Sequence, residues 1–561
     1  MAYVITQACC NDASCVSVCP VNCIHPTPDE APFMRTEMLY IDPEACIDCS
    51  QCVYACPVDA IRSEDDLDDE TMPYLEINAA YYEKHPIELG TPLKRPAKKN
   101  FDYTTLRVAI VGSGPAASYA AIELLGHRGV QVNMFERLLT PYGLVRFGVA
   151  PDHPGTKAVT EVFQLLGDEP GFRLNLGIEV GKHLTHDELL AHHHAVIYAV
   201  GAPGDRRLGV EGEDLPGSHA ATEFVAWYNG HPDFADRRFD LSHERAVIVG
   251  NGNVALDVAR ILVTDPDELH RTDMADHAVE ALRKSKVREV VVLGRRGPAQ
   301  AAYTNPEFIA LTNLDGVDIV IDPADAELDE HSRALIDSDA IEPSVRIKAE
   351  LAESVAATST TGKAKRIVFR YMASPVAVVG DECVNGLRIA RNTLSAGPAG
   401  MLLATPGSET EIVETGLVLR SIGYRGNATV DLPFDDSLGI IPNEGGRVVD
   451  PATGAALKGV YTAGWIKRGP SGVIGTNKKC ASDTVARILE DFENSRLDVP
   501  ISSAEDLEAI VTTRNPDVLN FAGWTKIDVA EKANGELRGR PRLKFTDIES
   551  MLAAARANAS D

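Results

Sequence analysis

The chain has 561 residues, of which 44% are hydrophobic and 24% are charged, a balance that excludes disordered and fibrous proteins. Its formal net charge of -28 argues against nucleic acids and anionic membrane surfaces as partners, because like charges repel at long range. The first residues, MAYVITQ, show no basic leader with an apolar stretch, and no run could span a bilayer, so we expect a cytoplasmic protein without membrane contact. A chain of this length is expected to form several compact units.

The cysteines are concentrated at the beginning of the chain, where nine of the eleven lie within the first 56 residues. In a reducing cytoplasm, thiols grouped at short spacings indicate metal rather than disulfides. One group has the pattern C-x2-C-x2-C-x3-C-P, in which a tight loop gives three thiolates to one iron-sulfur cluster and the fourth to a neighbouring cluster. Zinc, the alternative, usually takes two cysteine pairs separated by a longer spacer. This group consists of Cys46, Cys49, Cys52 and Cys56.

An earlier group repeats the pattern with Asp12 in place of the second thiolate and contains Cys9, Cys15 and Cys19. If the last cysteine of each group binds the other cluster, one cluster is held by Cys9, Cys15 and Cys56. The other is then held by Cys19, Cys46, Cys49 and Cys52. The first cluster is then either a three-iron centre or a four-iron centre whose last iron takes the Asp12 carboxylate. We interpret the remaining Cys10 and Cys23 as buried thiols near a cluster, with Cys10 as an alternative ligand to Cys9.

The matching segments CPVNCI (19–24) and CPVDAI (56–61) make this part of the chain resemble bacterial two-cluster ferredoxins of the seven-iron type. It departs from that pattern in a shorter gap between Cys9 and Cys15. The resemblance implies a small α+β ferredoxin-like domain over residues 1–75. Residues 76–103 follow, and their prolines and basic residues without apolar periodicity favour an extended linker.

A strand over 107–111 then leads into the glycine turn Gly112-Ser113-Gly114-Pro115-Ala116 and a helix. Such a turn lets a backbone approach a pyrophosphate closely at the helix N-terminus. The next strand ends at Glu136, where a carboxylate is expected to bind ribose hydroxyls. Strand, turn, helix and acid together predict a Rossmann-like dinucleotide site.

A second turn of the same design follows the strand over 246–249 and contains Asn251, Gly252, Asn253 and Val254. The strand over 290–293 leads to Arg295 and Arg296, where an NAD enzyme would carry an acid. Two guanidinium groups can hold a 2'-phosphate by charge-assisted hydrogen bonds, so NADP is favoured over NAD.

Four further segments, 141–154, 198–202, 250–257 and 464–477, make the chain after the linker similar to adrenodoxin-reductase-like ferredoxin-NADP reductases. The resemblance implies an α/β fold with an FAD domain in two parts, 104–205 and 421–561, and an NADP domain over 206–420. It places Arg206 and Glu307 at the NADP site and His153 near the isoalloxazine as a candidate catalytic residue. It also implies FAD contacts from Leu144, Val180, Trp465, Gly472, Val473 and Ile474.

The expected function is that of a ferredoxin-NADP+ reductase in which FAD mediates between NADPH and iron-sulfur carriers. The carriers are the fused ferredoxin, a separate ferredoxin or both, and the resemblance extends to downstream acceptors such as cytochrome P450 systems. The alternatives are an electron-delivery subunit like the small subunit of glutamate synthase, and a passive N-terminal docking domain. Lys467, Arg468 and the segment 538–544 are candidates for docking an acidic ferredoxin, and His192-His193-His194 is interpreted as a solvated helix end.

Overall fold

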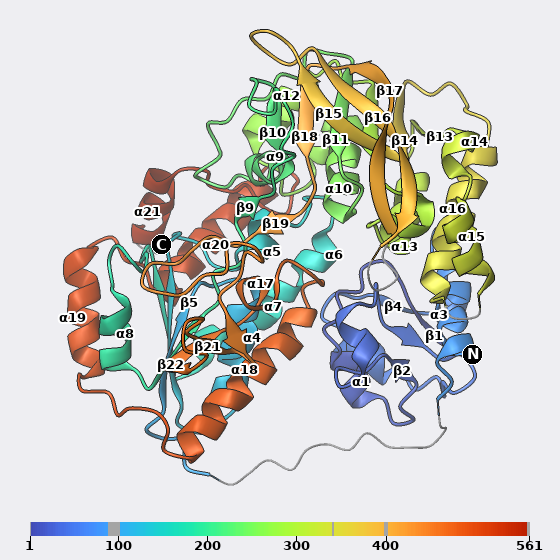
Figure 1. Ribbon diagram of the computed structural model, residues 1–561. Coiled ribbons are helices and arrows are strands. Elements are labelled where there is room, and N and C mark those ends of the chain that lie inside the picture. The colour runs from blue at the N-terminus through green and yellow to red at the C-terminus, as the bar shows by residue number, and fades with distance from the viewer. Residues whose placement is uncertain (1, 88–100, 339–340, 398–401, 558–561) are drawn as a thin grey trace.

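The computed structural model describes residues 2–87, 101–338, 341–397 and 402–557. It has the predicted α/β class: a small α+β unit and two larger units, each built on a largely parallel sheet. Figure 1 shows the small unit in blue, below the helices of the yellow region and beside the long orange helix α18 (Thr476–Glu493). None of the helices in the described ranges is long and apolar enough to cross a membrane.

The small N-terminal unit contains two short antiparallel sheets, in which β1 pairs with β4 and β2 pairs with β3. Its elements are β1 (Tyr3–Ile5), α1 (Ser14–Val18), β2 (Ile24–His25), β3 (Tyr40–Ile41), α2 (Gln51–Ala55), β4 (Ile61–Ser63) and α3 (Pro73–Lys84).

Helix α3 extends beyond the predicted boundary between this unit and the linker, so that boundary is corrected. Its residues Tyr74, Ile77 and Tyr81, spaced to share one helix face, are buried in the core of the unit. On the same helix, Asn78 Oδ1 accepts hydrogen bonds from the backbone of β1 and β3, and these polar bonds join both sheets to the helix. The unit therefore continues to Lys84, although the linker was predicted to begin at residue 76; residues 88–100 of that linker lie outside the described ranges.

The first nucleotide-type unit has a seven-stranded sheet in the order β20-β21-β22-β8-β5-β6-β7, whose strands β22 through β7 are parallel. Strand β5 is apolar almost throughout because it is covered on both faces. The strands are β5 (Arg107–Val111), β6 (Gln131–Glu136), β7 (Phe172–Leu176), β8 (Ala195–Tyr198), β20 (Asn443–Glu444), β21 (Arg447–Val449) and β22 (Ala456–Thr462). The helices are α4 (Pro115–Leu125), α5 (Leu144–Phe147), α6 (Pro154–Lys157), α7 (Val159–Gln164), α8 (His186–His192), α17 (Trp465–Arg468), α18, α19 (Ala504–Arg514), α20 (Phe521–Glu536) and α21 (Ile548–Arg556).

The second nucleotide-type unit is inserted between the two parts of the first and has a parallel sheet in the order β10-β18-β11-β12-β14-β13. A three-stranded antiparallel sheet, β15-β16-β17, packs against one face of its inner strands. The strands are β10 (Ser218–Ala220), β11 (Arg245–Val249), β12 (Glu289–Leu293), β13 (Val317–Ile321), β14 (Lys365–Arg370), β15 (Ala373–Val379), β16 (Gly386–Ala396), β17 (Leu402–Glu414) and β18 (Leu417–Arg420). The helices are α9 (Ala221–Tyr228), α10 (Asn253–Val263), α11 (Pro266–Leu269), α12 (Asp276–Arg283), α13 (Asn305–Thr312), α14 (Pro323–Ala326), α15 (Glu330–Asp337) and α16 (Pro343–Ala357).

The two larger units are joined by the ribbon of β9 (Gly204–Asp205) and β19 (Tyr424–Arg425), and by buried ion pairs. Asp273 of the inserted unit binds Lys157 at 2.7 Å and Lys544 at 3.0 Å. Burial would raise the pKa of Asp273, but the two ammonium groups hold it well below its usual range. The segment 538–544 was predicted as a candidate docking surface, and this is wrong for Arg540 and Lys544, which are buried in this seam.

The histidines 192–194 are also buried, which contradicts the predicted solvated helix end. His192 is the last residue of α8, and His193 Nε2 lies 2.8 Å from Asn133 Nδ2 on β6. His194 Nδ1 accepts a hydrogen bond from the backbone of Arg107 at the start of β5. They are structural residues at the end of the seven-stranded sheet.

Candidate functional site

The first glycine turn has the open geometry that a dinucleotide phosphate requires. Gly112 has a φ of +100°, and a Cβ there would lie 2.5 Å from the carbonyl oxygen of Ala199, so only glycine fits. Gly114 caps α4 and faces open space, with nothing within 4 Å of a Cβ placed on it. Pro115 and Ala116 begin the helix, whose free N–H groups point toward that space.

Glu136 lies where the sequence predicted it, at the end of β6 beside the first turn. Its Oε2 accepts hydrogen bonds from the N–H (3.1 Å) and hydroxyl (2.7 Å) of Ser113, which fixes the carboxylate at the mouth of the turn. Gly143 brings the next loop against Gly114, and Leu144, which begins α5, is 40% exposed there. Val180 packs on the opposite face of the sheet, with Phe135 and Ile178.

A second glycine-rich turn, residues 469–475, approaches the same place from α17. A Cβ on Gly464, which begins α17, would lie 2.7 Å from the Cβ of Ala116, so the two helix starts meet. Trp465 packs on Tyr424 with ring centroids 5.0 Å apart and donates from Nε1 to the carbonyl of Ser471. The turn then presents Gly472, Val473 and Ile474 before α18 begins.

Arg468 is a residue of this site that the sequence analysis misassigned to a docking surface. Its Nη2 donates to Thr476 and Asn477, while Nε and Nη1 are buried with no hydrogen-bond partner in the protein. Burial lowers its pKa. Unpaired buried donors are rare and costly, so this guanidinium fits a bound acceptor such as the carbonyl edge of a flavin ring. Lys467 also turns inward, to Thr484, and is not a docking residue either.

The inserted unit carries the other nucleotide turn. A Cβ on Gly250 would lie 2.1 Å from the carbonyl oxygen of Ser421, and Gly252 caps α10, which begins with Asn253 and Val254. Asn251 accepts from the backbone of Ala302, and Asn253 accepts from that of Thr304. The two asparagines therefore tie the turn to the loop before α13.

The basic pair after β12 has the predicted position and suits a phosphate. Arg295 is exposed and Arg296 is half-buried; burial and the adjacent Arg295 charge together lower the pKa of Arg296. Because Arg295 is exposed and Arg296 is only partly buried, both guanidinium groups remain available to bind a phosphate dianion. Arg206 lies on the ribbon between the units, exposed, with its Nε donating to the carbonyl of Tyr424 at 3.4 Å.

His153 lies at the junction of the units, where the structure brings together a charged group that sequence reasoning largely missed. Its Nε2 lies 3.3 Å from Asp257 Oδ1 and 3.7 Å from Glu307 Oε2. Arg260 Nη2 lies 2.7 Å from both the His153 ring and the Asp257 carboxylate. Gln7 of the N-terminal unit reaches Glu307 at 3.5 Å, so all three units contribute to this group.

The charges in this group set the protonation of its members. Burial alone would lower the pKa of His153, but the Asp257 carboxylate raises it above its ordinary value. Burial would raise the pKa of Asp257, yet Arg260 and His153 lower it to about 2. Burial raises the pKa of Glu307, and the Asp257 charge adds to the shift. The group therefore combines a fixed anion, a fixed cation and two residues poised to hold a proton.

The cysteines of the N-terminal unit separate into an outer and an inner set. The outer set lines one cavity with Tyr3 and Ile41 and consists of Cys19, Cys46, Cys49 and Cys52, as predicted for one cluster. Cys23 lies in the same cavity with its sulfur 3.5 Å from that of Cys19, and hydrogen bonding with the Cys23 side chain lowers the pKa of Cys19 and of Cys46 to about 6. In the described residues, no three sulfurs lie within 4.8 Å of one another.

The inner set is Cys9, Cys15 and Cys56, which lie close enough to influence one another. Burial raises the pKa of Cys15 well above its usual range, and the neighbouring Cys9 and Cys56 raise it further. Asp12, the possible fourth ligand, is turned toward the flavin-type unit. Its carboxylate accepts from the hydroxyl of Tyr119 at 2.9 Å and from Lys478 Nζ at 3.2 Å.

The seam between the N-terminal unit and the rest of the chain has a consistent polarity. Among the described residues, four ion pairs with a lysine or arginine partner cross it, and in each the acid belongs to the N-terminal unit; the His85–Glu342 contact has the opposite sense. The four pairs are Asp12–Lys478, Asp29–Lys479, Glu37–Lys348 and Glu83–Arg346. The Lys478-Lys479 pair beside the 464–477 segment is the sequence signal for this docking.

Comparisons with known proteins give the family context of the chain. Residues 39–62 match the family of 4Fe-4S binding domains, and residues 106–291 match the pyridine nucleotide-disulphide oxidoreductase family. A probable ferredoxin/ferredoxin--NADP reductase of Mycobacterium tuberculosis is 52% identical over 566 residues, covering 99% of this chain and 95% of the relative. The NADPH-ferredoxin reductase FprA of the same organism is 45% identical over 79% of this chain and 98% of its own length. The structure of that FprA in complex with NADPH covers 81% of this chain and all of its own, with 44% identity and a TM-score of 0.75.

Proposed function

The chain belongs to the ferredoxin/ferredoxin-NADP reductase family, and on that premise we propose that it passes electrons from NADPH to the ferredoxin unit within the same polypeptide. It is an oxidoreductase that works with FAD, NADP and an iron-sulfur cluster. The finer assignments are our proposal: the ferredoxin-NADP+ reductase reaction, the two-cluster arrangement and the residue roles.

One contact supports transfer within the chain. The N–H of Gly475, in the turn that approaches Ala116, donates to the carbonyl oxygen of Cys10 at 2.7 Å. The loop that contains Cys9 and Asp12 therefore lies directly against the turn assigned to the flavin. Two ferredoxin residues, Val58 and Ala60, are also part of the hydrophobic core under β5 and α4.

We assign the FAD contacts to the first glycine turn, Glu136, Leu144, Val180, Trp465 and the turn 472–474, and add Arg468 to them. NADP is assigned to the second turn, Arg206, Arg295, Arg296 and Glu307. FAD held by these residues would supply the link between the two carriers, because a flavin can accept a hydride and give up electrons one at a time. His153, with Asp257 and Arg260 against its ring, orients the groups at the junction and can hold a proton there.

We assign two clusters, one to the outer cysteines and one to Cys9, Cys15 and Cys56. The Asp12 carboxylate already binds Tyr119 and Lys478, so the inner site offers three protein ligands and fits a three-iron centre better than a four-iron one.

We keep the division at 206 and 420 between the FAD and NADP domains, extend the ferredoxin domain to Lys84, and place the protein in the cytoplasm. Cytochrome P450 systems are among the acceptors we propose.

Two glycines at the same seam test the proposal. A Cβ on Gly475 would lie 2.1 Å from the backbone of Asn11, whereas a Cβ on Gly155 would meet Val58 and Ala8 of the same unit at ordinary distances of 3.5 and 3.9 Å. We expect Gly475→Ala to slow reduction of the iron-sulfur chromophore by NADPH at least about tenfold while flavin reduction stays unchanged, because the loop must move off the turn.

Gly155→Ala is the matched control and should behave like the wild type. Anaerobic stopped-flow absorbance at the flavin and iron-sulfur bands separates the two steps. If Gly475→Ala reduced its clusters at the wild-type rate, transfer across this contact would be refuted.

A further inference from the structure

The two cysteine loops of the ferredoxin unit have the same backbone, displaced by 37 residues in the sequence. Left-handed φ angles occur at Asn11 (57°) and Ala13 (61°) in the first loop, and at Asp48 (55°) and Ser50 (56°) in the second. A non-glycine residue adopts such angles rarely, so two matching pairs indicate one repeated structure. By this register Ile47 corresponds to Cys10.

The surroundings of the two loops differ. Cys10 and Asn11 are 3% and 0% exposed because the first loop is docked on the turn at Gly475. Ile47 is 58% exposed, and Asp48 is exposed as well, although they occupy the corresponding positions. Tyr54, on α2 just after Cys52, is 85% exposed. The second loop therefore presents to solvent the surface that the first loop uses for a protein contact.

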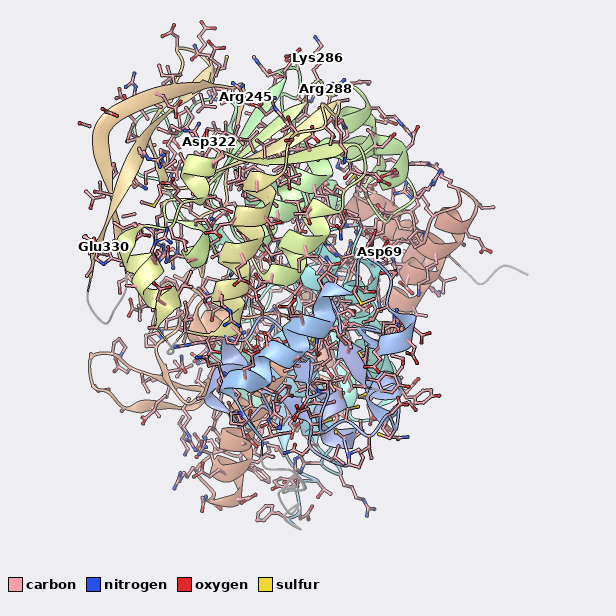
Figure 2. The ribbon with its side chains drawn as sticks, turned by 90° about the vertical axis from the view of Figure 1, so that its right-hand side faces the viewer. Asp69, Arg245, Lys286, Arg288, Asp322 and Glu330 are labelled. Atoms are coloured by element: carbon pink, nitrogen blue, oxygen red, sulfur yellow. The ribbon has the colours of Figure 1, made fainter. Side chains whose placement is uncertain are left out.

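The charge of the unit limits which partner this surface can accept. Residues 1–84 contain sixteen Asp and Glu against three Lys and Arg, a formal charge of -13. Asp48, between Cys46 and Cys49, is exposed. The acidic run 64–70 contributes six of these acids, and Figure 2 shows its Asp69 on the surface of the ferredoxin unit.

From these observations we propose that the loop 46–52, with Tyr54, is the docking surface for an external one-electron acceptor protein whose contact face has a rim of lysine or arginine. The proposal rests on the proposed function, since only a chain that reduces its ferredoxin unit has electrons to pass on. Two acceptor molecules each gain one electron for every NADPH oxidised to NADP+ and a proton. The internal seam is the model for the contact: acids on the ferredoxin side, bases on the partner, around a loop beside the cysteines.

Binding can be measured without turnover, with oxidised cytochrome c, a small basic haem protein, as the probe in the absence of NADPH. We expect the dissociation constant to rise with salt, and to rise about tenfold in Asp48→Lys and about fivefold in Ile47→Ser, because one places a like charge in the contact and the other removes its exposed apolar centre. Cytochrome c with acetylated lysines should bind weakly to every variant.

The controls separate local docking from net charge and hydrophobicity. Asp69→Lys changes the charge of the same unit equally, and Ile501→Ser removes an 88% exposed isoleucine from the distant end of the reductase part. Iron content and the visible spectrum must match the wild type in each variant. The proposal is overturned if Asp48→Lys and Asp69→Lys weaken binding equally, or if Ile47→Ser changes self-association by sedimentation and leaves binding unaltered.

NADPH bleaching of the protein's own chromophores, measured without cytochrome c, tests the proposed function separately. If NADPH bleached the chromophores normally and the loop variants bound cytochrome c as tightly as the wild type, only the proposed docking surface would be refuted. Absent bleaching would refute the proposed function instead.

Discussion

The two seams of the molecule join their partners by different means. Between the FAD and NADP units the pairs range from Lys544–Asp273, at 1% and 10% exposure of the side chains, to Arg137–Asp233, at 47% for both. Between the ferredoxin unit and the rest, the pairs range from Glu37–Lys348, at 15% and 8%, to Asp29–Lys479, at 92% and 27%. A hydride moves only between atoms nearly in contact, so its two domains need a rigid seam. Single electrons cross without such contact, and the ferredoxin seam includes a pair as exposed as Asp29–Lys479.

The largest effect that would sharpen this contrast is expected from Asp273→Asn. The change leaves the ammonium groups of Lys157 and Lys544 buried without their anion, which should cost about 3–5 kcal/mol of unfolding free energy. Urea unfolding monitored by release of flavin fluorescence measures it. Asp517→Asn, whose partner Arg556 is exposed, is the control and should cost less than about 0.5 kcal/mol.

A smaller effect is expected from Glu37→Gln at the ferredoxin seam. Glu37 binds Lys348 at 3.0 Å and accepts from the backbone of Asn305 at 2.9 Å, and glutamine keeps one acceptor but loses the charge. We expect a loss of about 1–3 kcal/mol in the stability of the docked ferredoxin unit. Hydrogen exchange of α3 and α16, which pack together, would report it. Asp29→Asn should leave exchange unchanged; equal effects of the two variants would contradict the contrast within this seam.

The smallest effect concerns pH at the junction of the two seams. The folded protein holds a proton on His153 more tightly than the unfolded chain, so the His153 contribution to stability is present below about pH 6.5 and declines as pH rises through the raised pKa. Glu307, whose pKa is also raised, changes stability in the same direction. Urea midpoints at about pH 6 and pH 8 should therefore differ less in His153→Gln than in the wild type. A larger difference in the variant would show that the sign is wrong.

The parts of the molecule that a local pattern determines were predictable. The turns at Gly112 and Gly250, the acid at Glu136 and the arginine pair after β12 follow from backbone geometry that only a few residue types permit. The cysteine spacing likewise predicted the outer set that lines one cavity. The FAD, NADP and ferredoxin character of the chain could be inferred before the fold was known.

The parts that depend on contacts between distant segments were not predictable. Prolines and charged residues lie in and next to helix α3, and such residues favour a linker. Only the packing of the helix on β1 and β3 makes it part of the core. The histidines 192–194 look solvated until Asn133 and Arg107 are placed against them. Arg468 and Lys467 were predicted as surface bases because no pattern in the sequence shows that α17 turns them inward.

The place of β22 in the seven-stranded sheet has a consequence for synthesis of the chain. This strand, residues 456–462, lies beside β8 although the whole inserted unit separates them in sequence. A ribosome therefore releases the ferredoxin and NADP segments before the FAD sheet can close, and Gly475 and Lys478 emerge later still. The contact between the ferredoxin loop and the turn at Gly475 therefore cannot form until the chain has emerged beyond residue 478, long after the cysteines at the N-terminus.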